Sequence, residues 1–129
     1  MKSGIAHIGM YCKDLEKVKM FYENYFGAQS TRKYTNPVKG FESYMLSFGD
    51  GACRLELMRK VGVDAVPLSA ALGFAHVSLS VGSKAGVDAI TDLLRGDGYK
   101  ILDGPRTTGD GFYESTVADP EGNLVEITV

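Results

Sequence analysis

The sequence predicts an α+β fold built from two βαβββ modules. The main observation is an internal repeat: residues 5–10 resemble residues 74–79 at an offset of 69, and residues 54–57 resemble residues 124–127 at an offset of 70. A repeat at a nearly constant offset indicates one structural unit used twice. The length of 129 residues suits one compact domain. We therefore expect a single domain over 1–129, with module one at about 1–66 and module two at about 67–129.

A helix is expected in each module, directly after the first strand. In module one, Asp14 is suited to cap the helix and Gly27 to end it. In module two, Ser83 is suited to cap the helix, and Gly96 or Gly98 to end it. Between these signals, apolar residues recur at helical spacing: Leu15, Val18, Phe21, Tyr22 and Tyr25 in module one, and Val87, Ile90 and Leu94 in module two.

The other strands are expected beyond each helix. In module one they are predicted near 30–34, 43–48 and 53–58, with a hairpin turn at Asp50-Gly51. In module two they are predicted near 99–102, 113–118 and 123–129, with a turn at 119–122. Residues 34–40 and 104–111 are expected to form the longest polar loops, and residues 67–72 to join the modules.

Alternation along four of these strands separates an apolar row from a polar row, because successive strand residues point to opposite faces of a sheet. The apolar rows are suited to pack under a helix. A lone His or Glu in a strand is most often exposed or paired with a neighbour. Here the chain has only two His, each at the same place in its module and each matched by a Glu near the module end. One cluster explains this pattern better than four independent accidents: His7, Glu56, His76 and Glu126.

Two imidazoles and two carboxylates together suit a divalent metal ion. Zn²⁺, Ni²⁺, Co²⁺ and Fe²⁺ accept this mixed donor set, whereas Ca²⁺ and Mg²⁺ prefer shells made only of oxygen. We expect one divalent ion per site, with Zn, Ni or Co ahead of Fe. An octahedral ion would keep positions for water or for a substrate that binds through two oxygens.

Charge and composition argue against several other classes of protein. Lys plus Arg number 14 and Asp plus Glu number 16, which gives a net charge of −2. This balance argues against a nucleic-acid binder or a polybasic membrane-surface binder. The sequence shows neither an apolar run of bilayer-spanning length nor a signal peptide, so a cytoplasmic protein is expected. Cys12 and Cys53 fit no metal-binding spacing and are expected to be reduced and partly buried thiols.

The chain resembles glyoxalase I-like members of the vicinal oxygen chelate superfamily, which also includes bleomycin resistance proteins and dioxygenases. The resemblance covers nearly the whole chain and is carried by residues 6–8, 21–27, 55–57, 75–79 and 119–127. It implies paired βαβββ modules that curl around a metal site, the glyoxalase-like fold. Its four ligand positions correspond to His7, Glu56, His76 and Glu126.

The resemblance also implies a reaction. Glyoxalase I, or lactoylglutathione lyase, isomerises the hemithioacetal of a 2-oxoaldehyde to a 2-hydroxyacyl thioester through an enediolate. By resemblance, Glu126 is the preferred catalytic base, and Glu56 is a ligand and the second candidate base. The family further implies a small-molecule substrate and a homodimer whose sites are shared between chains. The charge balance adds the expectation of no nucleic-acid and no membrane partner.

Two departures from the family pattern concern the thiol. Glutathione-dependent members tend to carry Arg four residues after the first His and Asn four residues after the first Glu, where this chain has Tyr11 and Lys60. We therefore expect glutathione not to be a strongly preferred thiol. Cations that could receive an anionic substrate group are Arg54, Arg59, Lys60 and Arg106, and aromatic residues that could line a pocket are Tyr11, Phe41, Tyr44, Phe112 and Tyr113.

Two alternative functions stay open at this point. An Fe²⁺ extradiol-type dioxygenase uses two His and one carboxylate, so the additional Glu56 argues against it. A non-enzymatic antibiotic-binding or resistance module often lacks the ligands, so the full set of two His and two Glu argues against that reading. Fold similarity alone does not decide between these functions.

Overall fold

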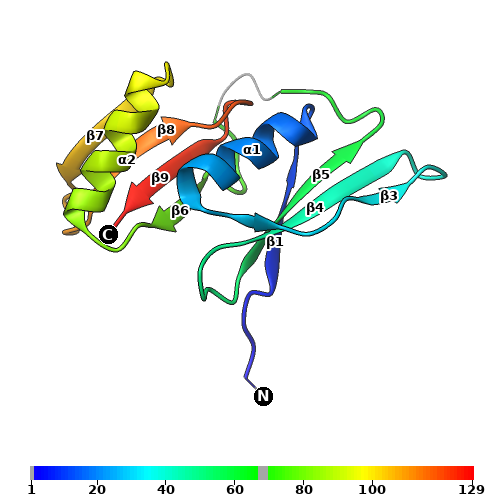
Figure 1. Ribbon diagram of the computed structural model, residues 1–129, viewed down its shortest axis with the longest axis horizontal. Coiled ribbons are helices and arrows are strands. Elements are labelled where there is room, and N and C mark those ends of the chain that lie inside the picture. Colours follow the sequence, from blue (N-terminus) through cyan, green and yellow to red (C-terminus); the bar gives the residue numbers. More distant parts are fainter. Residues whose placement is uncertain (1, 67–69) are drawn as a thin grey trace. The chain divides into compact units, whose positions relative to one another are not determined.

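A computed structural model describes residues 2–66 and 70–129. Its chain divides into two compact units, Met1–Val66 and Pro67–Val129 (Figure 1). The first unit contains β1 (His7–Tyr11), α1 (Leu15–Phe26), β2 (Gln29–Ser30), β3 (Tyr34–Asn36), β4 (Phe41–Ser47) and β5 (Arg54–Lys60). The second contains β6 (His76–Ser80), α2 (Lys84–Gly96), β7 (Ile101–Thr107), β8 (Tyr113–Ala118) and β9 (Leu124–Thr128). The predicted α+β class is confirmed: the second unit is βαβββ, and the first has the same order with one additional short strand.

Each unit forms a mixed sheet in which the first strand pairs in parallel with the last. In the first unit the strand order is β1-β5-β4-β2, and β3 also pairs with β4. In the second unit the order is β6-β9-β8-β7. The pairs β1–β5 and β6–β9 are parallel, whereas the other pairs are antiparallel. The helix and the strands that follow it together form the long connection that a parallel pair requires.

The helices begin and end where the capping residues predict. The Asp14 side chain accepts a hydrogen bond from the Lys17 amide, and Gly27 ends α1 in the left-handed conformation at φ 63°. The Ser83 side chain accepts a hydrogen bond from the Gly86 amide at the start of α2, which ends at Gly96. These bonds satisfy amides that have no partner within the helix.

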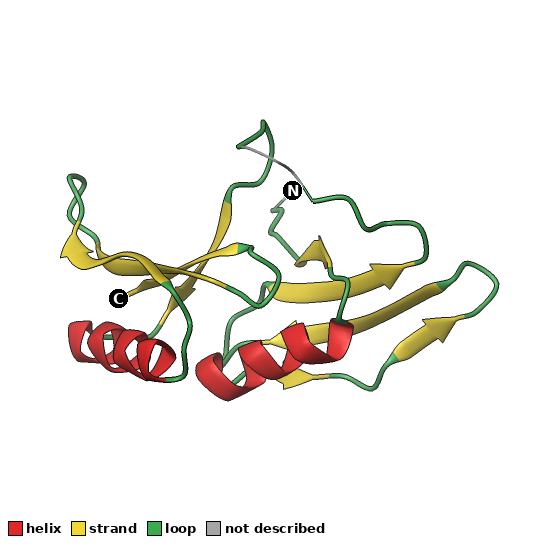
Figure 2. Cartoon of the chain, turned by 90° about the horizontal axis from the view of Figure 1, so that it is seen from above, coloured by secondary structure: helices red, strands yellow, loops and turns green. Residues whose placement is uncertain are grey.

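One face of each sheet is covered by its own helix. In the first unit, α1 packs on β5 and β2, and in the second, α2 packs on β7, β8 and β9. Figure 2 shows each helix lying along one side of the sheet of its unit. The fully buried side chains include Val18 and Leu57 in the first unit and Val87, Leu94, Val125 and Ile127 in the second. The predicted apolar rows of β5 and β9 therefore belong to the two cores, whereas those of β1 and β6 are only half-buried.

The strand expected at 30–34 is split into β2 and β3, which corrects the prediction. Ser30 lies opposite Leu46 and Tyr34 opposite Ser43, so residues 31–33 contain one more residue than the facing part of β4. The Thr31 hydroxyl accepts the hydrogen bond of the Met45 amide at 3.1 Å. A side chain thus replaces a backbone partner at the point where the pairing shifts.

The polar loops predicted at 34–40 and 104–111 are shorter than expected. Residues 34–36 belong to β3, and β7 continues to Thr107 although it contains Gly104 and Pro105. The strand β7 lies at the edge of its sheet, and its register with β8 shifts twice. Gly104 and Pro105 indicated a loop in the sequence. They are compatible with a strand here because a strand at the edge of a sheet tolerates a proline. The predicted join at 67–72 lies partly outside the described residues, which omit 67–69.

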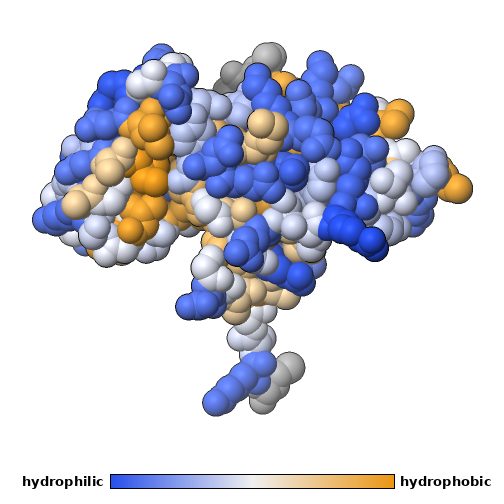
Figure 3. Space-filling view, viewed as in Figure 1, coloured by the Kyte–Doolittle hydropathy of each residue, from blue (hydrophilic) through white to orange (hydrophobic). Residues whose placement is uncertain are grey.

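The described residues also locate both thiols and the exposed apolar side chains. Cys12 is buried, whereas Cys53 is exposed, which corrects the expectation that both are partly buried, and neither forms a disulfide within the described part of the chain. Figure 3 shows apolar residues along α2, where Leu93 is half-exposed. Neither helix in the described part of the chain has the length and apolar character needed to cross a bilayer.

A buried hydroxyl pair between α2 and β8 provides a test of this packing. The Thr91 hydroxyl donates to the Val87 carbonyl at 2.6 Å and lies 2.7 Å from the Ser115 hydroxyl, so Ser115 donates to Thr91. Thr91→Val should lower the free energy of unfolding by about 1–3 kcal/mol, because it leaves the Ser115 hydroxyl without its acceptor. Ser115→Ala should cost less, because Thr91 keeps its bond to Val87. Urea unfolding of both variants and of the double variant measures these costs, and equal costs for the single variants would contradict the assigned donor direction.

Candidate metal centre

The first His–Glu pair lies on two adjacent parallel strands. His7 of β1 is in register with Arg54, and Gly9 is in register with Glu56 of β5, so His7 and Glu56 are diagonal neighbours on one face of the sheet. His7 Nε2 lies 3.5 Å from Glu56 Oε2. The His7 side chain is 45% exposed and that of Glu56 is 22% exposed. The pair is therefore formed within the unit and is open to solvent.

The second pair repeats this arrangement. His76 of β6 is in register with Leu124, and Ser78 is in register with Glu126 of β9. His76 Nε2 lies 3.2 Å from Glu126 Oε2, with side-chain exposures of 43% and 23%. The register, atoms and exposure match those of the first pair, so the internal repeat of the sequence preserves the local geometry of the pair.

The residues beside each Glu explain why the carboxylates lie on the face away from the helix. Leu55 and Leu57 flank Glu56 and are buried, and Val125 and Ile127 flank Glu126 and are fully buried. Since successive strand residues alternate between faces, burying these residues under a helix directs each Glu to the opposite face. The predicted division into apolar and polar rows is thus confirmed.

The spacing within each pair fits two neighbouring ligands of one metal ion. Metal–nitrogen and metal–oxygen bonds of about 2.0–2.2 Å place adjacent ligand atoms about 3 Å apart in an octahedral shell and about 3.4 Å apart in a tetrahedral one. The observed distances of 3.5 Å and 3.2 Å are close to these values. A neutral imidazole nitrogen and a carboxylate oxygen are also the donors that Zn²⁺ and its neighbours accept.

Each unit brings together two of the four predicted ligands. As far as each unit is described, no third His, Cys, Asp or Glu joins the pair in a metal-binding cluster. The structure thus assembles His7 with Glu56 and His76 with Glu126. The combination of all four around one ion stays a prediction.

The surroundings of the two pairs differ. In the first unit, strand register places Tyr11, Arg54, Met58 and Lys60 on the same face as the pair. In the second unit, the corresponding face carries Ser78, Ser80, Glu114, Thr116 and Thr128. The first pair therefore has basic and apolar neighbours, whereas the second has hydroxyl groups and a further carboxylate.

Glu114 was not predicted from the sequence. It lies opposite Thr128 and Arg106, two residues along β8 from Thr116, which faces Glu126. Burial, followed by the negative charge of Glu126, raises the pKa of the Glu114 carboxyl above its usual range. Alternation along 113–118 was the available signal, because it places Glu114 and Thr116 on one face.

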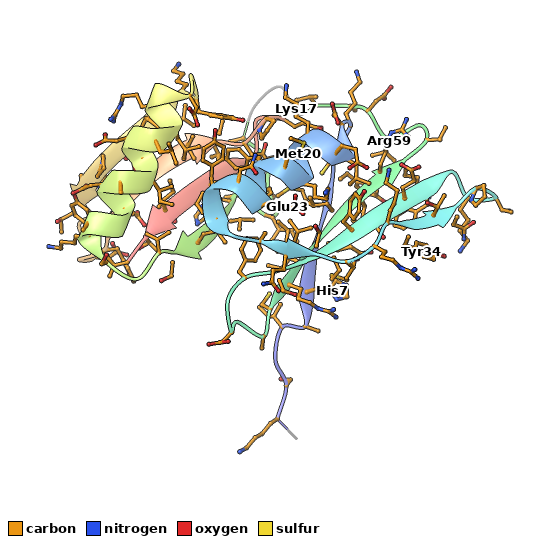
Figure 4. All side chains as sticks on the ribbon, in the orientation of Figure 1. His7, Lys17, Met20, Glu23, Tyr34 and Arg59 are labelled. Atoms are coloured by element: carbon orange, nitrogen blue, oxygen red, sulfur yellow. The ribbon has the colours of Figure 1, made fainter. Side chains whose placement is uncertain are left out.

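Two other predicted anion-binding residues already have acidic partners. Arg59 is in register with Glu42 and lies 3.8 Å from its carboxylate. Figure 4 shows His7 and Arg59 toward opposite ends of the sheet of the first unit. Arg106 binds the Asp103 carboxylate at 2.8 Å. These two cations already have anionic partners, which removes them as free anion-binding groups.

Two of the aromatic residues proposed as pocket walls are bound to the helices instead. The Tyr44 hydroxyl donates to Glu16 of α1 at 2.9 Å, and the Tyr113 hydroxyl donates to Asp88 of α2 at 2.6 Å. Each of these bonds raises the pKa of its tyrosine, together with burial, which is the larger cause at Tyr44. Tyr44 and Tyr113 therefore belong to the helix side of their sheets, which corrects the prediction. Tyr11 lies on the face that carries His7.

The turn at 119–123 fixes the start of the strand that carries Glu126. The Asp119 carboxylate accepts hydrogen bonds from the Glu121 amide at 2.9 Å and the Asn123 amide at 3.0 Å. The Asn123 side chain donates to the same carboxylate at 2.9 Å. These bonds close the loop in which the sequence predicted a turn, and the pairing of Ala118 with Leu124 begins directly after it.

Comparisons with known proteins agree with this architecture. The sequence pattern of the Glyoxalase/Bleomycin resistance protein/Dioxygenase superfamily matches residues 4–127. Among curated proteins, no sequence matches the chain.

Solved structures with this fold include three that are described as glyoxalases. The trypanothione-dependent glyoxalase I of Leishmania major is 22% identical over 98% of this chain and 86% of its own, with a TM-score of 0.78. Glyoxalase I from Zea mays is 24% identical over 96% of this chain, with a TM-score of 0.79, and the match spans 43% of the Zea mays chain. A possible glyoxalase from Bacillus cereus is 25% identical over 99% of this chain and 100% of its own, with a TM-score of 0.74.

These structures share the fold, and the superfamily pattern extends over almost the whole sequence. All four residues of the His–Glu pairs lie within the matched residues. The chain belongs to the Glyoxalase/Bleomycin resistance protein/Dioxygenase superfamily.

Proposed function

We propose that this protein is a metal-dependent lyase or isomerase of the glyoxalase type. Its substrate would be a small oxygenated compound, such as the hemithioacetal of a 2-oxoaldehyde, that reacts through an enediolate. The observation that carries the proposal is the pair of matched His–Glu contacts, at 3.5 Å and 3.2 Å, on the sheet faces away from the helices. Two imidazoles and two carboxylates complete a ligand set only if both pairs serve one ion.

The proposed ligands are His7, Glu56, His76 and Glu126. A divalent ion bound there would polarise the vicinal oxygens of the substrate and stabilise the charge of the enediolate. The donor set supports Zn, Ni or Co, with Fe as a further candidate.

The two Glu side chains are the candidates for proton transfer. We assign Glu126 as the base that takes the proton from one substrate carbon and returns it to the adjacent carbon, by resemblance to glyoxalase I. Glu56 is the second candidate, since its exposure and its distance to a His match those of Glu126. The net reaction is an isomerisation, so no oxidant or reductant is needed.

The division of the ligands supports an assembly in which two units complete each site. Each unit carries two ligands on its exposed face, and a metal site of this class needs at least three protein ligands. We propose a single glyoxalase-like domain per chain and a symmetric cytoplasmic homodimer with two sites. Each site would combine His7 and Glu56 of one chain with His76 and Glu126 of the other.

The first prediction concerns metal binding. The protein should bind about one divalent ion per chain, and His7→Ala or His76→Ala should weaken binding more than about tenfold, because even outer-shell partners of a metal contribute that much. Elemental analysis and metal titration of protein purified without chelator measure both quantities. Glu114→Gln is the matched control, because this carboxylate lies near the second pair but is not a proposed ligand. A wild-type protein that takes up none of Zn²⁺, Ni²⁺, Co²⁺ or Fe²⁺ would contradict the enzyme proposal and favour a binding module.

The second prediction concerns the thiol. Glutathione should not be strongly preferred, because Tyr11 and Lys60 stand where glutathione-dependent relatives tend to carry Arg and Asn. Steady-state kinetics with methylglyoxal hemithioacetals of glutathione and of other small thiols test this directly. A kcat/KM above roughly 10⁵ M⁻¹s⁻¹ for the glutathione adduct, within the range of ordinary enzymes, would refute the prediction.

The third prediction tests whether sites are shared between chains. Glu56→Ala and Glu126→Ala should each be inactive alone, but a mixed dimer would place both lesions in one site and none in the other. With random exchange, half of the dimers are mixed, so about a quarter of all sites should be active. Activity should be measured after subunit exchange has been verified by mass spectrometry. No recovery in exchanged dimers would show that both pairs of a site come from one chain.

A further inference from the structure

An unpaired arginine lies next to the first His–Glu pair. Arg54 of β5 is in register with His7 of β1, and Glu56 is the next residue of β5 on the same face. Residues two apart in a strand are about 6.6 Å apart. Arg54 is exposed, and no acidic side chain among the described residues forms an ion pair with it.

Three of the other arginines are neutralised by acidic neighbours. Arg59 pairs with Glu42, Arg95 with Asp92, and Arg106 with Asp103. Four cations were predicted as anion-binding groups from the sequence. Among them, Arg54 has no acidic partner within the described residues and lies beside the proposed ligands.

The fold itself does not require a cation at this position. The second unit repeats the same register, and there the residue opposite His76 is Leu124. A leucine therefore occupies the equivalent position of an equivalent parallel strand pair. Arg54 distinguishes the first half-site from the second, which points to a role in binding.

The other side of Glu56 is apolar. Met58 is the next residue on this face, and its register partner is Tyr11. The Met58 Cε atom lies only 2.8 Å from where a Cβ on Gly9 would be, so the absent side chain of Gly9 leaves room for Met58 over β1. Lys60, the second basic residue on the face, is four residues from Glu56, or about 13 Å along the strand. Of these two basic residues on the described face, Arg54 is the one within a side-chain length of the pair.

We propose that Arg54 binds a substrate carboxylate located a few bonds from the oxygens that chelate the metal. This inference rests on the proposed function and narrows the substrate class to 2-oxo or 2-hydroxy compounds that carry such a carboxylate. A guanidinium suits this role because it offers two parallel N–H donors to one carboxylate. Arg54 is a specificity residue here, and proton transfer stays with the Glu side chains.

Two matched probes test the proposal on the metal-loaded protein. The monohydroxamate of succinic acid carries a chelating group and a carboxylate, and the corresponding monohydroxamate carboxamide replaces the carboxylate by a neutral group of similar size. Calorimetric titration of wild type should show about tenfold tighter binding of the carboxylate probe, the effect of one charge-assisted hydrogen-bonded pair. The preference should decrease with added salt.

The variants separate a role in binding from a role in folding. Arg54→Leu introduces the residue found at the equivalent place in the second unit, so it should keep the metal and bind both probes equally. Arg54→Lys should keep part of the preference, because the charge remains and the paired donors are lost. Lys60→Leu is the matched control on the same strand face and should keep the full preference. Thermal unfolding and metal content verify that each variant is intact.

The outcomes distinguish this inference from the function on which it rests. Equal binding of both probes by wild type, or loss of the preference in Lys60→Leu with retention in Arg54→Leu, would overturn the role of Arg54 and leave the metal site standing. Failure of either probe to bind protein that demonstrably holds metal would overturn the proposed chelating site, and the inference with it.

Discussion

The parallel pairing of the first and last strands in each unit is the constraint on which the candidate site depends. It places His7 diagonal to Glu56 and His76 diagonal to Glu126, with the same register in both units. The helix between the strands then covers the apolar face, so each pair faces away from the core. A shift of one residue in either register would move a ligand to the opposite face, where the buried core residues lie.

Because the two units are repeats of each other, residues at equivalent positions can be compared directly. Both keep the His–Glu pair, the capped helix and the strand order. They differ around the pair, with Arg54 and Met58 in the first unit where the second has Leu124 and Thr128, and with Glu114 in the second where the first has Ser43. In our proposal the shared part holds the metal, and the parts that differ give the substrate its orientation.

Local signals in the sequence were sufficient for much of the fold. Asp14, Gly27 and Ser83 predicted helix ends because capping is decided by a few neighbouring residues. Alternation likewise predicted the faces of the strands. The split of the strand near Thr31 and the extension of β7 through Gly104 and Pro105 could not be predicted, because both depend on which strand lies alongside and on whether the strand is at an edge.

For the candidate site too, the sequence predicted the features that depend on local pattern but not the contacts that depend on the tertiary structure. Matched positions in the repeat were enough to associate His7 with Glu56 and His76 with Glu126. The sequence could not show that Arg59 and Arg106 are already ion-paired, that Tyr44 and Tyr113 bind the helices, or that Glu114 lies near Glu126, because these contacts depend on cross-strand register and side-chain packing.

We propose that one divalent ion is held by both His–Glu pairs together. A crystal structure of the metal-loaded protein, with anomalous data collected at the absorption edge of the bound metal, tests it most directly. Binding by both pairs predicts one metal peak per chain, within about 2.0–2.3 Å of Nε2 of His7 and His76 and of a carboxylate oxygen of Glu56 and Glu126. A metal bound by one pair alone, or by residues outside both pairs, would contradict it.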